Sequence, residues 1–369
     1  MPQVKQIVEA LGTLAPWDLA ESWDRVGLQV GSADADATRV MVALDLNPEV
    51  IQEGIEHGVD GFVLHHPLIF KPLTRVDPGA PVGRCLELLI KQGLFLIAAH
   101  TNMDKAEKGL NQYLAEQFGL TQIEPLEPVM EQLYKVVVFT PEDHLAAVRT
   151  AMAEAGAGTI GAYTGCSFGL KGIGTFKPGS QARPFTGRPG EFTEVSEIRL
   201  EMVAGPRHLP GVLKAITQNH PYETPAVDVY PLAGSGRQGL GRVGNLKTAL
   251  TFDDFVAMVQ KKLAVKGIRV SGRPGKLIRR LAICSGSGGN MVSAAAENRA
   301  DAYLTGEMGY HDFLYAKEKG LAVIAAGHWA TERGFIPMIC GFLNGVFKTE
   351  ESFEAVPCST IQEEPYLTL

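Results

Sequence analysis

Cysteine is scarce in this sequence and is not arranged in pairs. The 369 residues include five scattered cysteines with no C-x-x-C spacing: Cys85, Cys166, Cys284, Cys340 and Cys358. An odd, unpaired set of this type argues against a disulfide-stapled secreted fold and against a cysteine-ligated zinc finger. We therefore expect a cytoplasmic protein in which cysteine serves as a small apolar side chain.

Long apolar runs and an excess of basic charge are also missing. No run reaches the roughly eighteen apolar residues of a membrane span, and the first residues, MPQVKQIVEALG, lack the apolar core of a signal peptide. The formal charge of -7 and the pI near 5.8 argue against the basic surface that general nucleic-acid binding needs. A local basic pocket for a nucleotide or another phosphate-containing small molecule stays open.

What is present is a rhythm of helices and short apolar strands. Hydrophobic residues make up 45% of the chain, and its length predicts two or three domains. In residues 1–127, helices at 4–14, 48–58, 83–93 and 109–119 alternate with apolar runs at 40–46, 61–66 and 94–100. Residues 237–369 repeat this alternation. The pattern predicts an α/β fold with mainly parallel sheets.

The two outer stretches also resemble each other in sequence. VDGFVLHH in the first matches ADAYLTGE in the second, and KQGLFLIAAH matches EKGLAVIAAGH. The second pair of strands closes with His-x3-Asp at 100–104 and with His-x3-Glu at 328–332. This repeat predicts two pseudo-symmetric α/β halves whose strand ends face one cleft.

Residues 128–236 break the rhythm. Strand-like segments at 134–140, 159–165, 171–179, 197–205 and 226–232 surround two helical segments at 142–156 and 207–220. The order predicts a ferredoxin-like α+β domain inserted between the halves. We interpret the glycine-rich segment 234–246 as the linker that returns to the second half.

Five side chains at the predicted strand ends are suited to binding metal ions: His65, His66, Asp104, His328 and Glu332. Imidazole and carboxylate ligands without thiolate suit zinc, iron(II) or manganese. Five ligands exceed what one tetrahedral zinc needs and fit two divalent ions about 3–4 Å apart. The long side chain of Glu332 is the best candidate to bridge them, and the hydroxide shared by such a pair would be the nucleophile of a hydrolase.

Other residues are predicted to surround this site. His100 is expected to orient a metal ligand or to bind metal itself, and Glu307 to act as a general base or to lie at a solvated strand end. In the loop SWDRVGLQVG, Trp23 is expected to pack, with Asp24 and Arg25 at the cleft. The glycine-rich turn within ICSGSGGNM (285–289) either cradles a phosphate or forms a tight turn.

These motifs together resemble the NIF-three-like dinuclear-metal-centre proteins, also named GTP cyclohydrolase 1 type 2 homologues. The motifs are LHHPLIF, AAHTNMDKAEKGLN, GSGG, TGE and AAGHWATERG, and they cover about two-thirds of the chain. The resemblance implies a toroidal homohexamer and, in this longer form, an insert similar to the PII-like and divalent-cation-tolerance proteins. It also implies His66 and Asp104 on one metal, His65 and His328 on the other, and Glu332 bridging both. The chain departs from the family at Tyr310-His311, where many members have a histidine pair.

Two functions follow as alternatives. The first is metal-dependent hydrolysis, with C8 of the guanine of GTP as the target that the resemblance implies, or a phosphoester. The second is a non-enzymatic metal-binding, metallochaperone or regulatory assembly whose insert senses a small ligand.

Overall fold

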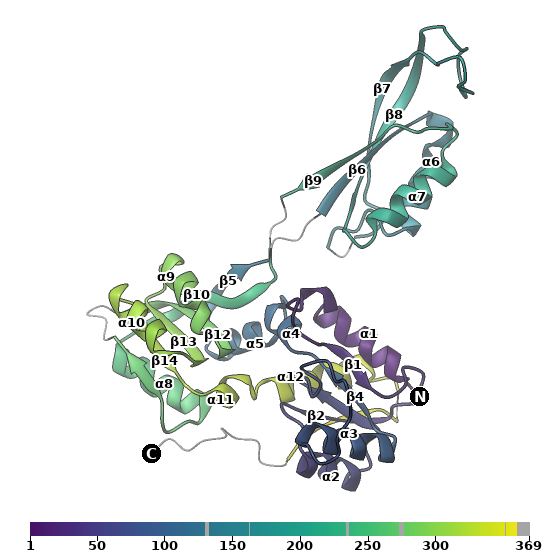
Figure 1. The fold of residues 1–369 in the computed structure, drawn as a ribbon. Coiled ribbons are helices and arrows are strands. Elements are labelled where there is room, and N and C mark those ends of the chain that lie inside the picture. The colour runs from purple at the N-terminus through teal and green to yellow at the C-terminus, as the bar shows by residue number, and fades with distance from the viewer. Residues whose placement is uncertain (130–132, 162, 234–235, 273–276, 351, 360–369) are drawn as a thin grey trace. The chain divides into compact units, whose positions relative to one another are not determined.

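The protein forms two compact units, Met1–Val129 with Gly236–Leu369, and Met130–Ser235. The computed structural model describes residues 1–129, 133–161, 163–233, 236–272, 277–350 and 352–359. Figure 1 labels most of their helices and strands. Within the described residues, no helix is long and apolar enough to pass through a bilayer. The prediction of a mixed α/β fold with several sheets is confirmed.

The first unit contains a five-stranded sheet in the order β1-β4-β3-β2-β15. Its strands are β1 (Gly27–Val30), β2 (Arg39–Ala43), β3 (Gly61–Leu64), β4 (Phe95–Ala98) and β15 (Glu354–Pro357). All pairs are parallel except β1 with β4. Because neighbouring residues point to opposite faces, each face has its own core. α1 (Val4–Leu14) and α12 (Phe335–Val346) cover one, and α2 (Pro48–Glu56) and α3 (Pro81–Gln92) the other.

A six-stranded sheet in the same unit has the order β11-β14-β13-β12-β10-β5. Its strands are β5 (Thr121–Pro128), β10 (Gly239–Leu250), β11 (Arg269–Ser271), β12 (Ile278–Ser287), β13 (Ala302–Glu307) and β14 (Ala322–Ala325). β12, β13 and β14 are parallel, whereas β11, β10 and β5 pair antiparallel. α5 (Leu110–Gln117) and α8 (Phe252–Leu263) cover one face, and α9 (Val292–Glu297) and α10 (Tyr310–Glu318) the other.

The two sheets share one arrangement of strands. In both, three parallel strands carry an antiparallel strand at one edge, as β1-β4-β3-β2 in the first and β11-β14-β13-β12 in the second. In both, the last parallel strand leads into a five-residue helix, α4 (Thr101–Lys105) after β4 and α11 (His328–Glu332) after β14. The chain also crosses between the sheets, because α5 and β5 join the second sheet and α12 and β15 return to the first. These crossings join the sheets into one unit.

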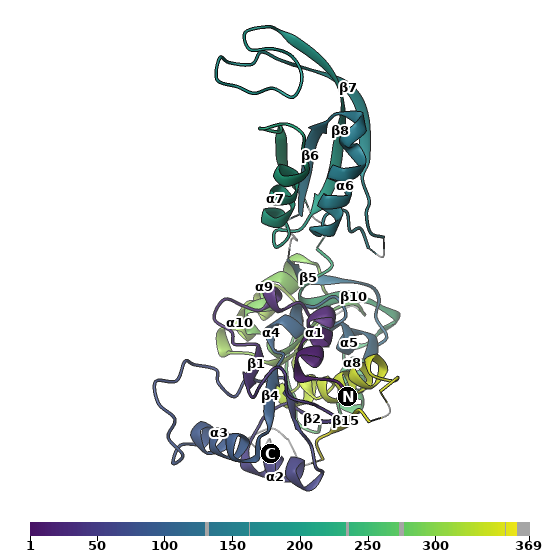
Figure 2. The same ribbon diagram turned by 90° about the vertical axis from the view of Figure 1, so that its right-hand side faces the viewer.

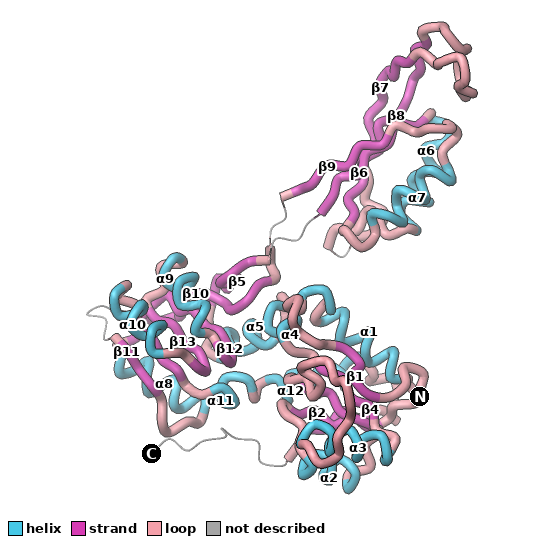
Figure 3. Tube along the Cα trace, in the orientation of Figure 1, coloured by secondary structure: helices cyan, strands magenta, loops and turns pink. Residues whose placement is uncertain are grey.

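The second unit has a four-stranded antiparallel sheet in the order β7-β8-β6-β9. Its elements are β6 (Leu133–Thr140), α6 (Leu145–Glu154), β7 (Phe168–Phe176), β8 (Thr193–Ala204), α7 (Leu209–Asn219) and β9 (Val227–Leu232). Figure 2 shows α6 and α7 beside this sheet, and their apolar side chains form one core with those of β6 and β8. Figure 3 shows the long loop that connects β7 to β8.

The prediction that the glycine-rich segment 234–246 is a linker is wrong. From Gly239 onward it forms strand β10, which lies between β5 and β12. Its glycines are explained by close packing: a Cβ on Gly241, at φ +65°, would lie 2.9 Å from the Ile283 carbonyl oxygen. The strand predicted at 159–165 is also wrong in its described part, where Ile160 and Tyr163 form an isolated bridge. Residues 162, 234 and 235 lie outside the described residues.

Candidate metal centre

Three short segments bring the predicted site residues together. β3 ends at Leu64, and His65 and His66 follow it directly. Asp104 lies in α4, which begins just after β4. His328 and Glu332 are the first and last residues of α11, and a spacing of four places both on one helix face. All five side chains therefore come from the carboxyl ends of parallel strands, where α/β sheets bind ligands.

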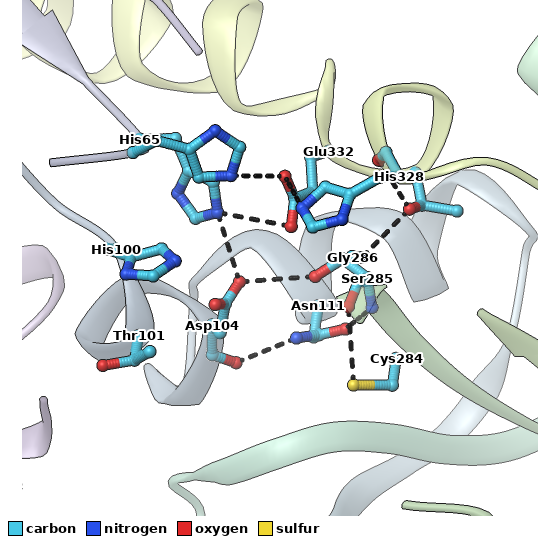
Figure 4. Close-up of polar contacts among 12 residues, drawn as sticks. His65, His100, Thr101, Asp104, Asn111, Cys284, Ser285, Gly286, His328 and Glu332 are labelled. Carbon is cyan, nitrogen blue, oxygen red and sulfur yellow. Dashed lines mark hydrogen bonds and ion pairs between the residues drawn. The ribbon is translucent and has the colours of Figure 1, made fainter. Parts of the chain in front are cut away.

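Glu332 lies at the centre of this cluster and is 3% exposed. Its Oε2 is 3.0 Å from His66 Nε2 and 3.1 Å from His328 Nε2, and its Oε1 is 3.6 Å from His65 Nε2. Asp104 Oδ1 is 3.8 Å from His65 Nε2. Figure 4 shows Glu332 facing His65 and His328, and Asp104 facing the same nitrogen of His65. The two carboxylate oxygens of Glu332 thus face different histidines.

Each histidine of the pair is fixed through its Nδ1 atom. His65 Nδ1 lies 3.0 Å from the Ala99 carbonyl oxygen, and His66 Nδ1 lies 2.9 Å from Asp45 Oδ1. These contacts leave both Nε2 atoms for the cluster. Pro67 follows the pair, and the chain leaves the strand there, so two adjacent residues approach one point despite the alternation of a strand. Their ring centroids are 5.0 Å apart.

His328 and His100 are held in the same way. His328 Nδ1 lies 3.3 Å from Glu307 Oε2, and His100 Nδ1 lies 3.0 Å from Asp24 Oδ1. Asp24 also accepts hydrogen bonds from the backbone N–H and hydroxyl of Thr101. In metal sites, contacts of this type fix the imidazole ring and direct its second nitrogen to the ion. Asp24 therefore supports His100 from inside the protein, whereas the neighbouring Arg25 does not line the cavity described below.

The charges in the cluster shift its pKa values strongly. Burial would lower the pKa of His66, but Asp45 and Glu332 outweigh it and raise the pKa to about 10. Burial likewise opposes protonation of His328, whose pKa Glu332 and Glu307 raise to about 9. Burial would raise the pKa of Glu332, but the surrounding histidines hold it well below its usual range. Without a cation, His66 and His328 thus carry the positive charge that the Glu332 carboxylate requires.

Small residues make room for the carboxylates. Gly286 has a φ of +60°, and a Cβ there would lie 2.1 Å from Glu332 Oε1 and 3.2 Å from His328 Nε2. Its backbone N–H donates to Thr331 Oγ1 at 3.0 Å. The Ser285 hydroxyl donates to Asp104 Oδ1 at 3.3 Å, and the Ser285 N–H donates to Asn111 Oδ1 at 2.8 Å. The glycine-rich turn therefore packs against the cluster, and its first two N–H groups are already bonded within the protein.

A cavity of about 820 Å³ opens beside the cluster. Asp104, His328 and Glu332 line it, together with His100 and Glu307. Its other walls carry aromatic, basic and polar groups, among them Trp23, Phe70, Lys105, Arg269, Ser287 and Asn290. The cavity is thus large enough for a drug-sized or nucleotide-sized molecule.

The structure separates the predicted residues into two groups. His65, His66, His100, Asp104, His328 and Glu332 lie together with Glu307 at their edge, whereas Tyr310 and His311 are exposed on α10 and do not line the cavity. The predictions do not include Asp45 and Asn111, and they name Ser285 only as part of the glycine-rich turn. Asp45 follows β2 at its carboxyl end, which is the signal that could have identified it.

Two overlapping groups in this cluster could hold a metal ion: His65 with His66 and His100, and His66 with His328 and Glu332. In each group, the ligand atoms lie within 4.8 Å of one another. The structure therefore supports a metal-binding cluster at this position.

Comparisons with known proteins agree with the observed fold. The family model Duf34/NIF3 (NGG1p interacting factor 3) matches residues 2–365. A GTP cyclohydrolase 1 type 2 homolog of Bacillus subtilis is 38% identical over 88% of both chains, and one of Mycobacterium leprae is 36% identical over 99% of this chain and 95% of its own. The crystal structure of a Bacillus cereus protein related to NIF3 is 35% identical, covers 100% of this chain and 99% of its own, and has a TM-score of 0.83. The chain therefore belongs to the Duf34/NIF3 family.

Proposed function

We propose that the cluster is a dinuclear centre for divalent metal ions. The observation that carries this proposal is the convergence of buried ligand atoms that lack hydrogen-bond partners. His65 Nε2 and Glu332 Oε2 are buried and, among the described residues, have no partner in hydrogen-bond geometry, although Oε2 lies 3.0 and 3.1 Å from the Nε2 atoms of His66 and His328. Such atoms are costly in a protein interior unless a cation or water occupies the space between them.

The distances suggest how the ligands divide. His65 and Asp104 lie on the Oε1 side of Glu332, and His66 and His328 lie on its Oε2 side. We propose these two sets as the two ion positions, with Glu332 shared. This division differs from the one that the family resemblance implies, in which His66 goes with Asp104. Zinc, iron(II) and manganese all suit the donor set.

The function best supported is hydrolysis of a small anionic substrate. When bound, two divalent ions would supply Lewis acidity and activate water near neutral pH. His100, with Nδ1 held by Asp24, is placed to accept a proton through its other nitrogen. Glu307, which also lines the cavity, is a second group that can accept or donate a proton. Arg269 supplies positive charge for a phosphate-bearing substrate, and Lys105, which pairs with Glu21 at 2.6 Å, is a second cationic group in the same wall.

GTP is the substrate to test first, because relatives covering most of the chain are named GTP cyclohydrolase 1 type 2 homologs. The protein is reconstituted in turn with zinc, iron(II) and manganese, and formate release from GTP is followed. We expect metal-dependent turnover that falls at least about a hundredfold in Glu332→Gln. Glu318→Gln, an exposed change on α10, is the matched control. Absence of turnover with both GTP and phosphoesters would refute the proposed hydrolase activity.

A non-enzymatic metal-binding or regulatory role is the second candidate. The observation that favours it is the separate unit of residues 130–235, which has its own core. We propose that this unit is a ferredoxin-like, PII-like insert, since β6-α6-β7-β8-α7-β9 with strand order β9-β6-β8-β7 is the split βαβ pattern. Reversible metal binding without turnover of any substrate tested would favour this role.

The family resemblance further suggests a homohexamer. We propose this assembly, and sedimentation equilibrium of the full chain tests it. A mass close to six times 39.7 kDa is expected, and a monomer at micromolar concentration would exclude it.

A further inference from the structure

The second unit contains a cavity that the proposed metal chemistry does not use. Its volume is about 390 Å³, which lies in the range of small-molecule sites. The end of β7, the loop between β7 and β8, and the segment that leads from α7 to β9 enclose it. The loop is held in place, because the Arg183 N–H donates to Glu223 Oε1 at 3.0 Å. The Oε1 atom of Glu223 therefore already accepts a hydrogen bond from the backbone.

A second carboxylate, Glu197 on β8, lines this cavity and is only 8% exposed. A Cβ on Gly174 would lie 2.1 Å from Glu197 Oε2, so the carboxylate occupies space that only glycine leaves open. Among the described residues, no basic side chain pairs with Glu197. Arg199, two residues further along β8, pairs with Glu201 instead, as does Lys135 on β6. Glu197 is thus a buried carboxylate that lacks a counter-charge within the part of the chain that the structure describes.

The neighbouring histidine does not supply that charge. His220 Nε2 lies 2.9 Å from the Phe139 carbonyl oxygen, and its Nδ1 accepts from the Tyr222 N–H at 3.1 Å. One nitrogen donates and the other accepts, which is the pattern of a neutral ring. Burial lowers the pKa of His220, in agreement with a neutral ring at pH 7.

Aromatic rings surround the carboxylate. Phe139, Phe176, Phe185 and Tyr222 all line the cavity, and the centroids of the last two are 5.9 Å apart. The Tyr222 hydroxyl is buried beside the Glu197 carboxylate, although among the described residues it has no partner in strict hydrogen-bond geometry. Burial first and Glu197 second raise the pKa of Tyr222, so the hydroxyl remains a donor. Aromatic faces combined with one buried carboxylate are the environment that recognises an organic cation.

We propose that this cavity binds a small organic cation, with its ammonium or guanidinium group on Glu197 and its apolar body against Phe185 and Tyr222. A cation at this position provides the counter-charge that a buried carboxylate requires. The proposal concerns the second unit alone and does not depend on the metal centre. It gives that unit a ligand of defined chemistry.

Three probes of similar shape test the charge requirement. Phenethylamine, 2-phenylethanol and 3-phenylpropanoate carry a cationic, a neutral and an anionic head on similar apolar bodies, and calorimetric titration of the full chain measures the affinity for each. We expect phenethylamine to bind at least about tenfold more tightly than the alcohol, and the carboxylate not to bind. Equal affinity for amine and alcohol, or no binding of the amine, would overturn the proposal.

Variants locate the site. Glu197→Gln should remove the preference for the amine, whereas Glu194→Gln, an exposed change of the same charge on the same strand, should retain it. Phe185 is 55% exposed, so Phe185→Ala should preserve the fold and still weaken phenethylamine binding several-fold. If Glu197→Gln does not fold, the Phe185→Ala result decides. Unchanged affinity in Phe185→Ala would place the amine elsewhere and refute the assignment.

Discussion

Arg242 offers a quantitative test of how the two sheets are joined. Its side chain is 1% exposed and donates to Gln112 Oε1 at 3.0 Å. It also donates to the carbonyl oxygens of Gly239 and Gly241, both at 2.7 Å, and to that of Ala106. Burial lowers the pKa of Arg242, but only to about 10, so the guanidinium is charged at pH 7. One side chain thus ties the segment after α4 to strand β10.

Arg242→Met keeps much of the volume but removes every donor. Hydrogen bonds from a charged group are worth about 1.5–3 kcal/mol each, and the cost of burying the charge offsets part of their sum. Several buried acceptors then lose this donor, so we expect the free energy of unfolding to fall by about 3–5 kcal/mol. Arg279→Met, an exposed change on β12, should cost less than about 0.5 kcal/mol.

Tryptophan fluorescence during urea unfolding measures this effect selectively. The three tryptophans are Trp17, Trp23 and Trp329, and all lie in the unit that contains Arg242. The midpoint should shift to lower urea with the slope unchanged. A loss below about 1 kcal/mol, or a loss equal to that of Arg279→Met, would show that the donors of Arg242 do not hold the sheets together.

Three further predictions concern the site and the cysteines. Gly286→Ala should abolish metal binding, because the added Cβ would collide with the Glu332 carboxylate. The control Gly341→Ala, whose Cβ meets nothing within 4 Å, should keep its metal. Equal metal content of the two variants by elemental analysis would contradict this prediction. Asp45→Ala should weaken metal affinity about 10–100-fold, because the carboxylate that fixes His66 Nδ1 is lost. Competition with a chelating dye measures this affinity. An affinity equal to that of the exposed control Asp253→Ala would contradict the prediction. The Cys340 thiol, whose pKa burial raises to about 11, should resist iodoacetamide at pH 8 until urea unfolds the chain; peptide mass spectrometry would disprove this by finding it labelled in the native protein.

Local pattern in the sequence predicts much of the first unit. The helix expected at residues 4–14 is α1, with the same bounds, and the apolar runs at 61–66 and 94–100 contain β3 and β4. These elements are identifiable because their burial follows a simple period or is continuous. The site residues were identifiable because the repeat places imidazole and carboxylate groups at matching strand ends.

Local sequence patterns do not predict which strands far apart in the chain pair with each other. β5, with the sequence TQIEPLEP, is polar and contains two prolines, so nothing local marks it as a strand. It forms because β10 lies beside it. The return of β15 to pair with β2 joins residues far apart in sequence, and no periodicity encodes such a contact. Asp45 follows β2 at its carboxyl end, but only the fold shows that its partner is His66 on the neighbouring strand end.

The measurement that tests the central claim most directly is metal content per chain. Protein purified without added metal or chelator is analysed by plasma mass spectrometry beside Glu332→Gln and the exposed control Glu318→Gln. The account predicts about two divalent ions per chain in the wild type and in Glu318→Gln, and a loss of both in Glu332→Gln, because one carboxylate serves both positions. One ion or none in the wild type, or a Glu332→Gln protein that keeps its metal, would contradict the dinuclear centre.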